Sequence, residues 1–99
     1  MRSSTFAGST IRQTVQSVLG PDARVRLFGS RTNDSAKGGD IDLLVESDTV
    51  IEQPVLVAAR IGALLQLALG DQRIDVLISA PNVPEQAIHQ VARANGITL

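Results

Sequence analysis

Hydrophobic residues follow helix spacing in some segments of the chain and strand alternation in others. Ile11, Val15 and Val18 recur at intervals of four and three residues, which predicts a helix that Gly20-Pro21 ends. Alternation and turn residues place the other elements. The pattern predicts strands over 24–28, 41–45 and 73–79, helices over 54–69 and 84–94, and a short edge strand over 97–99.

The segment 54–69 is apolar on almost every side of the predicted helix, with Arg60 and Gln66 as its main polar residues. A helix of this kind is either buried throughout or faces a partner, and a chain of 99 residues can scarcely surround one. We therefore expect an oligomer or a partner contact through this segment. The alternative is that its alanines form an ordinary solvent-facing side.

Length and composition predict one globular domain over residues 1–99, with residues 1–8 as a loose N-terminal arm. The formal net charge is −1 and aromatic residues make up 2%, so we expect no direct binding to long nucleic acids. Cysteine is absent, which excludes disulfides and zinc–thiolate sites. No signal peptide and no run of about 18 apolar residues is visible, so we expect a cytoplasmic protein with no membrane segment.

Two aspartates stand two positions apart where the strand over 41–45 begins. Successive side chains on a strand alternate between faces, so Asp40 and Asp42 share one face while Ile41 and Leu43 can enter the core. Two carboxylates about 6–7 Å apart repel each other unless a cation lies between them, and hard oxygen ligands favour Mg²⁺. A Gly-Ser turn over 29–30 precedes this strand and offers backbone N–H groups to an anion. Together these features predict a metal-dependent nucleoside triphosphate site.

Asp75 opens the apolar strand over 73–79 in a similar way. If this strand neighbours the strand over 41–45, Asp75 adds a third carboxylate to the pair. Three carboxylates can hold two Mg²⁺ ions about 3.5–4 Å apart, the arrangement that supports in-line displacement at phosphorus. In that arrangement Asp75 would hold or deprotonate the attacking hydroxyl.

The segments Leu27-Phe28-Gly29-Ser30-Arg31 and Gly39-Asp40-Ile41-Asp42-Leu43-Leu44-Val45 resemble the signature of the polymerase-beta-like nucleotidyltransferases, above all of the small group called minimal nucleotidyltransferases. The resemblance covers nearly the whole chain, although nine residues separate Ser30 from Asp40 where the family commonly has ten. It implies an α+β fold, with a small mixed β-sheet flanked by helices. It also implies Mg²⁺-dependent transfer of a nucleoside monophosphate, such as AMP from ATP, to a hydroxyl group.

The resemblance also implies site residues and a partner. It assigns triphosphate binding to Gly29 and Ser30, ligation of two Mg²⁺ ions to Asp40 and Asp42, and the third carboxylate to Asp75. Members of this group often work as the antitoxin of a small helical HEPN-type toxin, and some modify a tyrosine of that toxin with AMP. A HEPN-type protein is therefore the expected partner.

Several alternatives stay open from the residues alone. Arg31 could touch phosphate, or it could pair with Asp34 or Asp48 on the surface. A lone histidine at helical spacing is more often a surface residue than an acid or a ligand, so His89 receives no catalytic role. The chain could also be a non-catalytic binding module that neutralises a partner by contact, or a small regulatory domain with fortuitous aspartates.

Overall fold

The computed structural model of the chain describes residues 2–29, 41–70 and 73–99. Its elements are α1 (Arg2–Leu19), β1 (Arg24–Phe28), β2 (Ile41–Glu46), α2 (Pro54–Leu69), β3 (Ile74–Ser79), α3 (Ala87–Asn95) and β4 (Ile97–Thr98). The sequence pattern therefore predicted β1 and α2 with the observed bounds. It also predicted β2 and β3 to within one residue, because strong alternation and clear turn residues mark these segments.

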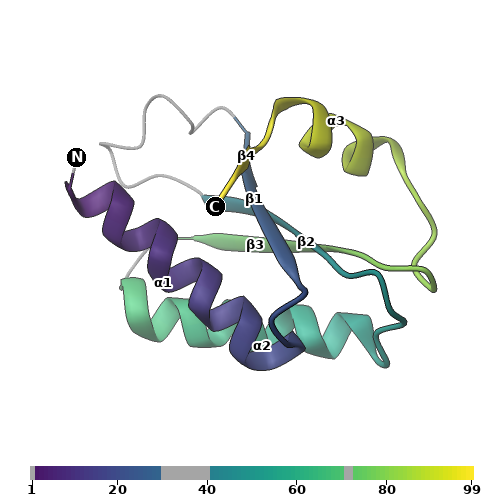
Figure 1. Ribbon diagram of the computed structural model, residues 1–99, viewed down its shortest axis with the longest axis horizontal. Coiled ribbons are helices and arrows are strands. Elements are labelled where there is room, and N and C mark those ends of the chain that lie inside the picture. Colours follow the sequence, from purple (N-terminus) through teal and green to yellow (C-terminus); the bar gives the residue numbers. More distant parts are fainter. Residues whose placement is uncertain (1, 30–40, 71–72) are drawn as a thin grey trace.

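The strands form one mixed sheet in the order β3-β2-β1-β4 (Figure 1). β1 pairs antiparallel with both β2 and β4, whereas β2 pairs parallel with β3. Two parallel neighbours need a crossover connection, and α2 supplies it. The expected α+β class, a small mixed sheet flanked by helices, is confirmed.

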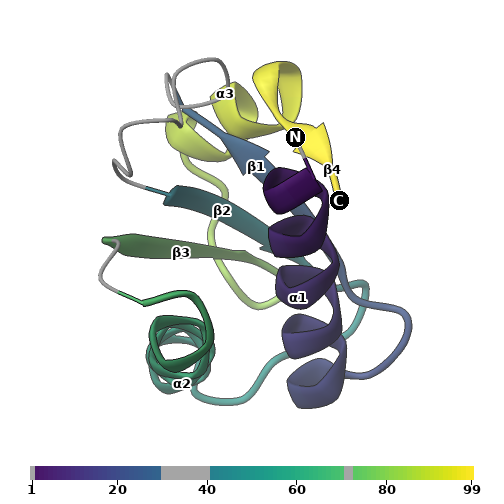
Figure 2. The same ribbon diagram turned by 90° about the vertical axis from the view of Figure 1, so that its left-hand side faces the viewer.

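Helices cover both faces of the sheet. α2 and α3 lie on opposite sides of the strands, and α1 runs across the same side as α2 (Figures 1 and 2). Leu43 and Val45 of β2 are buried in the core under α1 and α2, whereas Leu44 is buried with Phe28 and Ala92 on the side of α3. The predicted alternation along β2 is confirmed, and Asp42 belongs to the face of Leu44.

The beginning of α1 differs from the expectation of a loose arm over residues 1–8, because the helix already starts at Arg2. The only glycine or proline among these residues is Gly8, so nothing stops helix formation earlier. A Cβ built at Gly8 would lie 3.6 Å from Cδ2 of Leu99, so this part of α1 runs beside the C-terminal residue. The helix ends as predicted at Gly20, whose N–H donates to the carbonyl of Gln16 at 2.8 Å.

α3 begins at Ala87 rather than at Pro84, because His89 caps it from inside its first turn. The imidazole Nδ1 accepts the N–H of Gln86 at 2.9 Å, and the Gln86 side chain accepts a bond from the His89 backbone. Nε2 lies 2.9 Å from the carbonyl oxygen of Ile78, and since Nδ1 is an acceptor, Nε2 is the donor in that bond. His89 is 3% exposed, so its expected surface position was wrong, and both ring nitrogens serve the fold.

Candidate active site

Three residues on neighbouring strands form one row across the sheet. Phe28 of β1 pairs with Asp42 of β2 in the antiparallel ladder, and Asp42 pairs with Asp75 of β3 in the parallel ladder. Adjacent strands lie about 4.8 Å apart, so the two aspartates leave the sheet as immediate neighbours. The expectation that the strand of Asp75 neighbours the strand of Asp42 is confirmed.

Gly29 follows Phe28 and gives the Asp42 carboxylate its room. Its φ is +94°, in the region that residues with a side chain rarely adopt. A Cβ built at Gly29 would lie 2.5 Å from Oδ2 of Asp42, closer than real Cβ atoms approach any heavy atom. Glycine is thus required twice, by the backbone and by the carboxylate. The sequence marked Gly29 for phosphate binding but did not indicate this steric role.

A depression of about 300 Å³ opens over the carboxylates, lined by Phe28, Asp42, Asp75, Val76, Leu77 and Ile88. Its apolar lining residues come from β1, β3 and α3, and its two aspartates come from β2 and β3. The Asp75 side chain is 58% exposed, and its Oδ2 lies 3.8 Å from Nε of Arg73, which is 73% exposed. An ion pair this exposed contributes little to stability, so Asp75 is open to a ligand from solvent.

Other predicted site residues lie outside the described residues: Ser30, Arg31 and Asp40, together with Asp34 as a possible partner of Arg31. Asp48, the other possible partner of Arg31, bonds to Arg24, whose Nη2 lies 3.2 Å from Oδ1 of Asp48. Within residues 2–29, 41–70 and 73–99, no group of three or more His, Cys, Asp or Glu side chains is arranged to hold a metal. The described site therefore consists of the Asp42–Asp75 pair beside Gly29.

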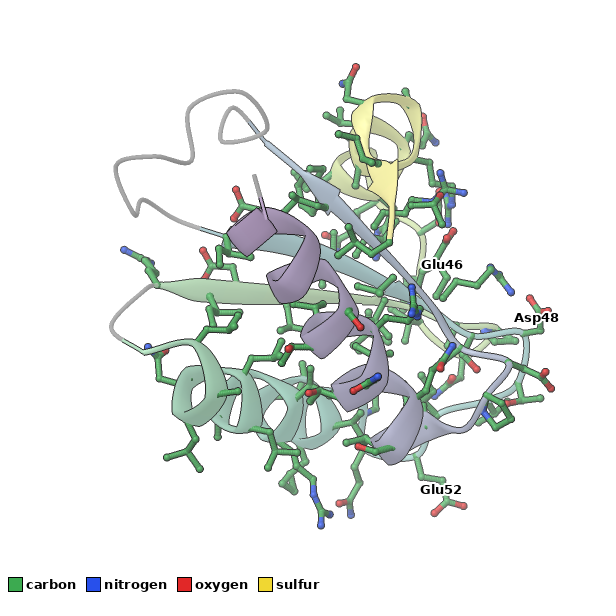
Figure 3. The ribbon with its side chains drawn as sticks, turned by 60° about the vertical axis from the view of Figure 1, so that its left-hand side comes forward. Glu46, Asp48 and Glu52 are labelled. Atoms are coloured by element: carbon green, nitrogen blue, oxygen red, sulfur yellow. The ribbon has the colours of Figure 1, made fainter. Side chains whose placement is uncertain are left out.

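A buried ionic cluster, which was not predicted from the sequence, lies around Glu46 at the other end of β2. Glu46 follows Asp42 and Leu44 on the same face, and its side chain is 8% exposed. Nε of Arg26 donates to one carboxylate oxygen at 2.9 Å, and Nε of Arg93 donates to the other at 3.0 Å. Figure 3 labels Glu46 in the interior and Asp48 farther out in the loop after β2. The strand alternation could have predicted that Glu46 is buried, because positions 42, 44 and 46 share a face and Leu44 is apolar.

Arg93 belongs to α3, so its bonds connect this cluster to the helix whose Ile88 lines the depression. Its guanidinium also donates to Oγ of Ser79 at 2.8 Å and pairs with Glu85. Burial alone would raise the pKa of Glu46, but the hydrogen bonds from Arg26 and Arg93 outweigh it and hold that pKa below its ordinary value. The bond from Arg93 likewise lowers the pKa of Glu85. Glu46 is therefore ionised at neutral pH and fixes α3 to the sheet.

Comparison with known proteins agrees with this arrangement. A family model described as a nucleotidyltransferase domain matches residues 9–95, which include every described element of the site. The chain belongs to the nucleotidyltransferase domain family. No curated protein matches the chain significantly. Among the described residues, no helix is long and apolar enough to cross a membrane.

Chains in solved structures of toxin–antitoxin complexes share the fold. The chain is 20% identical to a chain from the complex of the tri-AMPylated Shewanella oneidensis HEPN toxin with its MNT antitoxin, with a TM-score of 0.66 over 95% of this chain and 69% of that one. It is 19% identical, with a TM-score of 0.66, to a chain of the toxin–antitoxin complex MntA–HepT, covering 95% of this chain and 69% of that one. A mutant of that complex gives 22% identity and a TM-score of 0.64, over 92% of this chain and 68% of that one. At these identities the similarity establishes the fold.

Proposed function

We propose that this nucleotidyltransferase domain transfers AMP from ATP to a hydroxyl group of a partner protein, with two Mg²⁺ ions as cofactors. The observation that carries the proposal is the register of β2 and β3, which sets Asp42 beside Asp75 next to a glycine that leaves the carboxylate room. Membership in the nucleotidyltransferase family supports the reaction class. The tri-AMPylated toxin bound to a similar antitoxin supports AMP as the transferred group.

The donor set fits a hard divalent cation, because it consists of carboxylate oxygens on neighbouring strands. We assign metal ligation to Asp42 and Asp75, and to Asp40 from the sequence motif. Bound Mg²⁺ would neutralise triphosphate charge and lower the pKa of the attacking hydroxyl. Gly29 and Ser30 are proposed to bind the triphosphate, with Arg31 as a further phosphate contact.

The row across the sheet sets the direction of the proposed reaction. The triphosphate lies toward β1, next to Gly29, and the acceptor lies toward β3, next to Asp75. The acceptor oxygen attacks the α-phosphorus, the bond between the α- and β-phosphoryl groups breaks, and pyrophosphate leaves. Asp75 receives the proton of the acceptor hydroxyl, since its side chain is exposed on that side.

An Asp42→Asn variant tests the site. Mg²⁺ with ATP should raise the melting temperature of the parent, because a ligand that binds only the folded state stabilises it. Asp42→Asn should lose the Mg²⁺-dependent part of that rise. Asp22→Asn, which removes the same charge at an exposed turn, should keep it. A response of Asp42→Asn equal to that of the parent would show that the site is misassigned.

The proposed partner contact uses the exposed side of α2, which carries four large apolar side chains, Val55, Leu56, Leu64 and Leu67, together with the exposed Arg60. Leu56 is 58% exposed and Leu67 is 85% exposed, so the expected apolar surface is present. Large apolar patches of this kind mark interaction sites. Similar antitoxins are seen in complexes with HEPN toxins, and we propose a HEPN-type protein as the partner.

Charge placed on this face tests the contact. Leu56→Glu with Leu67→Glu should lower the mass measured by sedimentation, either of the chain with its HEPN-type partner or of a self-associated form. Both side chains are exposed, so the melting temperature should change little. A parent that sediments as a monomer at high concentration and binds no such partner would remove this part of the proposal.

A further inference from the structure

A second hollow, a groove beside β3, is not explained by the proposed catalytic arrangement of Phe28, Asp42 and Asp75. Its volume is about 390 Å³, and it lies between α2 and the edge of the sheet. One wall comes from α2, with the small residues Ala58, Ala59, Gly62 and Ala63 and the longer Gln66. The other wall comes from Ile74, Asp75 and Val76 of β3. Asp75 and Val76 also line the depression over the carboxylates, so the groove and the proposed site meet at these two residues of the edge strand.

Gly62 is unexplained by the fold itself. Glycine is the least favourable helix residue apart from proline. Its φ is not positive, and a Cβ built there would lie 3.9 Å from Cγ2 of Val76, an ordinary contact. Neither the backbone nor the described packing therefore requires glycine. A glycine inside a helix without an internal reason is consistent with the close approach of another chain, and Gly62 faces the groove.

β3 is the edge of the sheet, and among the described residues its one partner strand is β2. The carbonyls of Arg73 and Ser79 accept bonds from amides of the β2 segment. Because backbone groups alternate along a strand, the N–H and C=O groups of Ile74 and Val76 point away from β2. This edge can therefore accept a further strand.

We infer that the acceptor of the proposed reaction is an extended polypeptide segment that pairs with the free edge of β3 and lies against Gly62. Side chains of such a strand would alternate between the groove and the face that carries Asp75. A residue opposite Asp75 would place its hydroxyl next in the row of Phe28, Asp42 and Asp75. The described residues that line the groove include no lysine or arginine, which favours a peptide over a nucleic acid.

This inference rests on the proposed function. Peptides whose backbone amides are N-methylated test the strand pairing separately from the catalytic activity. The probe is a library of nonapeptides with a central Tyr, Ser or Thr, incubated with α-labelled ATP and Mg²⁺. The parent and Ala94→Leu, an exposed control on α3, should label the same peptides. Gly62→Leu fills the groove and should label them at least tenfold less, with an unchanged melting shift from Mg²⁺ and ATP. N-methylation of alternate peptide amides should abolish labelling in every variant.

The outcomes separate docking from catalysis. Equal labelling by Gly62→Leu and the parent, or equal labelling of N-methylated peptides, would overturn the inference and leave the proposed function intact. So would a parent that labels a folded partner but no peptide. If the parent labels nothing, the proposed function fails, and hydrogen exchange then decides the docking. Slower exchange of the Ile74 and Val76 amides on adding millimolar peptide would support strand pairing, and unchanged exchange would overturn it.

Discussion

Substitution of Gly29 by alanine should destabilise the protein in two ways, through backbone strain at residue 29 and through a steric clash with the Asp42 carboxylate. The alanine would have to keep the backbone φ of +94°, and its Cβ would lie 2.5 Å from Oδ2 of Asp42. The left-handed backbone costs an L-residue about 1–2 kcal/mol. Moving the carboxylate out of its position adds about 1–2 kcal/mol, the usual cost of overpacking or of an unfavourable rotamer. We therefore expect the free energy of unfolding to fall by about 2–4 kcal/mol.

The chain contains two matched controls for this experiment. Gly20 and Gly70 have φ of +104° and +92°, and a Cβ at either would meet nothing within 4 Å. Both follow the end of a helix and donate an N–H bond back into it. Gly20→Ala and Gly70→Ala should therefore cost only the backbone part, about 1–2 kcal/mol. Urea denaturation of the three variants gives the difference directly.

The carboxylate is identified as the cause by a double-mutant cycle. In an Asp42→Ala background the new Cβ has no Oδ2 to meet, so Gly29→Ala should cost no more than the controls. The coupling energy between the two sites should be about 1–2 kcal/mol. Gly29→Ala should also lose the Mg²⁺-dependent melting shift, whereas the two controls keep it. A Gly29→Ala cost equal to the controls, together with an intact shift, would refute the assigned steric role.

Three further predictions concern residues outside the carboxylate pair. Glu46→Gln should lower the free energy of unfolding by about 3 kcal/mol, because Arg26 and Arg93 lose a buried partner. Since the folded-state pKa of Glu46 is lowered, its contribution is present above the unfolded pKa of about 4.3 and is lost as pH falls through the folded value. Denaturation between pH 6 and pH 3 should thus show a weaker acid dependence in Glu46→Gln, and an identical dependence would contradict the assignment. Gly62→Ala should raise stability by about 1 kcal/mol, measured as a higher melting temperature. Finally, His89→Leu should cost about 2–4 kcal/mol through two orphaned backbone groups, while a lost Mg²⁺–ATP shift in a still folded variant would point to a role beyond capping.

Much of the fold was predictable because local signals agreed with one another. α2 and β1 have strong spacing and clear turn residues on both sides, and their bounds came out as expected. The pairing of Asp42 with Asp75 needed one further assumption, that the two strands are neighbours. The resemblance to nucleotidyltransferases supplied it, and the parallel register confirms it.

What could not be predicted depends on contacts between distant segments. The start of α1 lies beside Leu99, and His89 bonds to the carbonyl of Ile78. Neither the helical start of the chain nor the burial of His89 can therefore be inferred from neighbouring residues in the sequence. The steric need for Gly29 comes from Asp42 on the neighbouring strand. Glu46 looked like the polar end of a strand because its arginine partners come from β1 and α3.

The alternation along β2 also determines where this chain can change in length. Asp42 at one end and Glu46 at the other share a face, with Leu44 between them and Leu43 and Val45 in the opposite core. One residue inserted between Asp42 and Glu46 would send one carboxylate into the apolar core or out of its partners' reach. Length variation among relatives should therefore accumulate in the loops on either side and spare these five positions, so that gaps in an alignment would mark the outer limits of the functional strand.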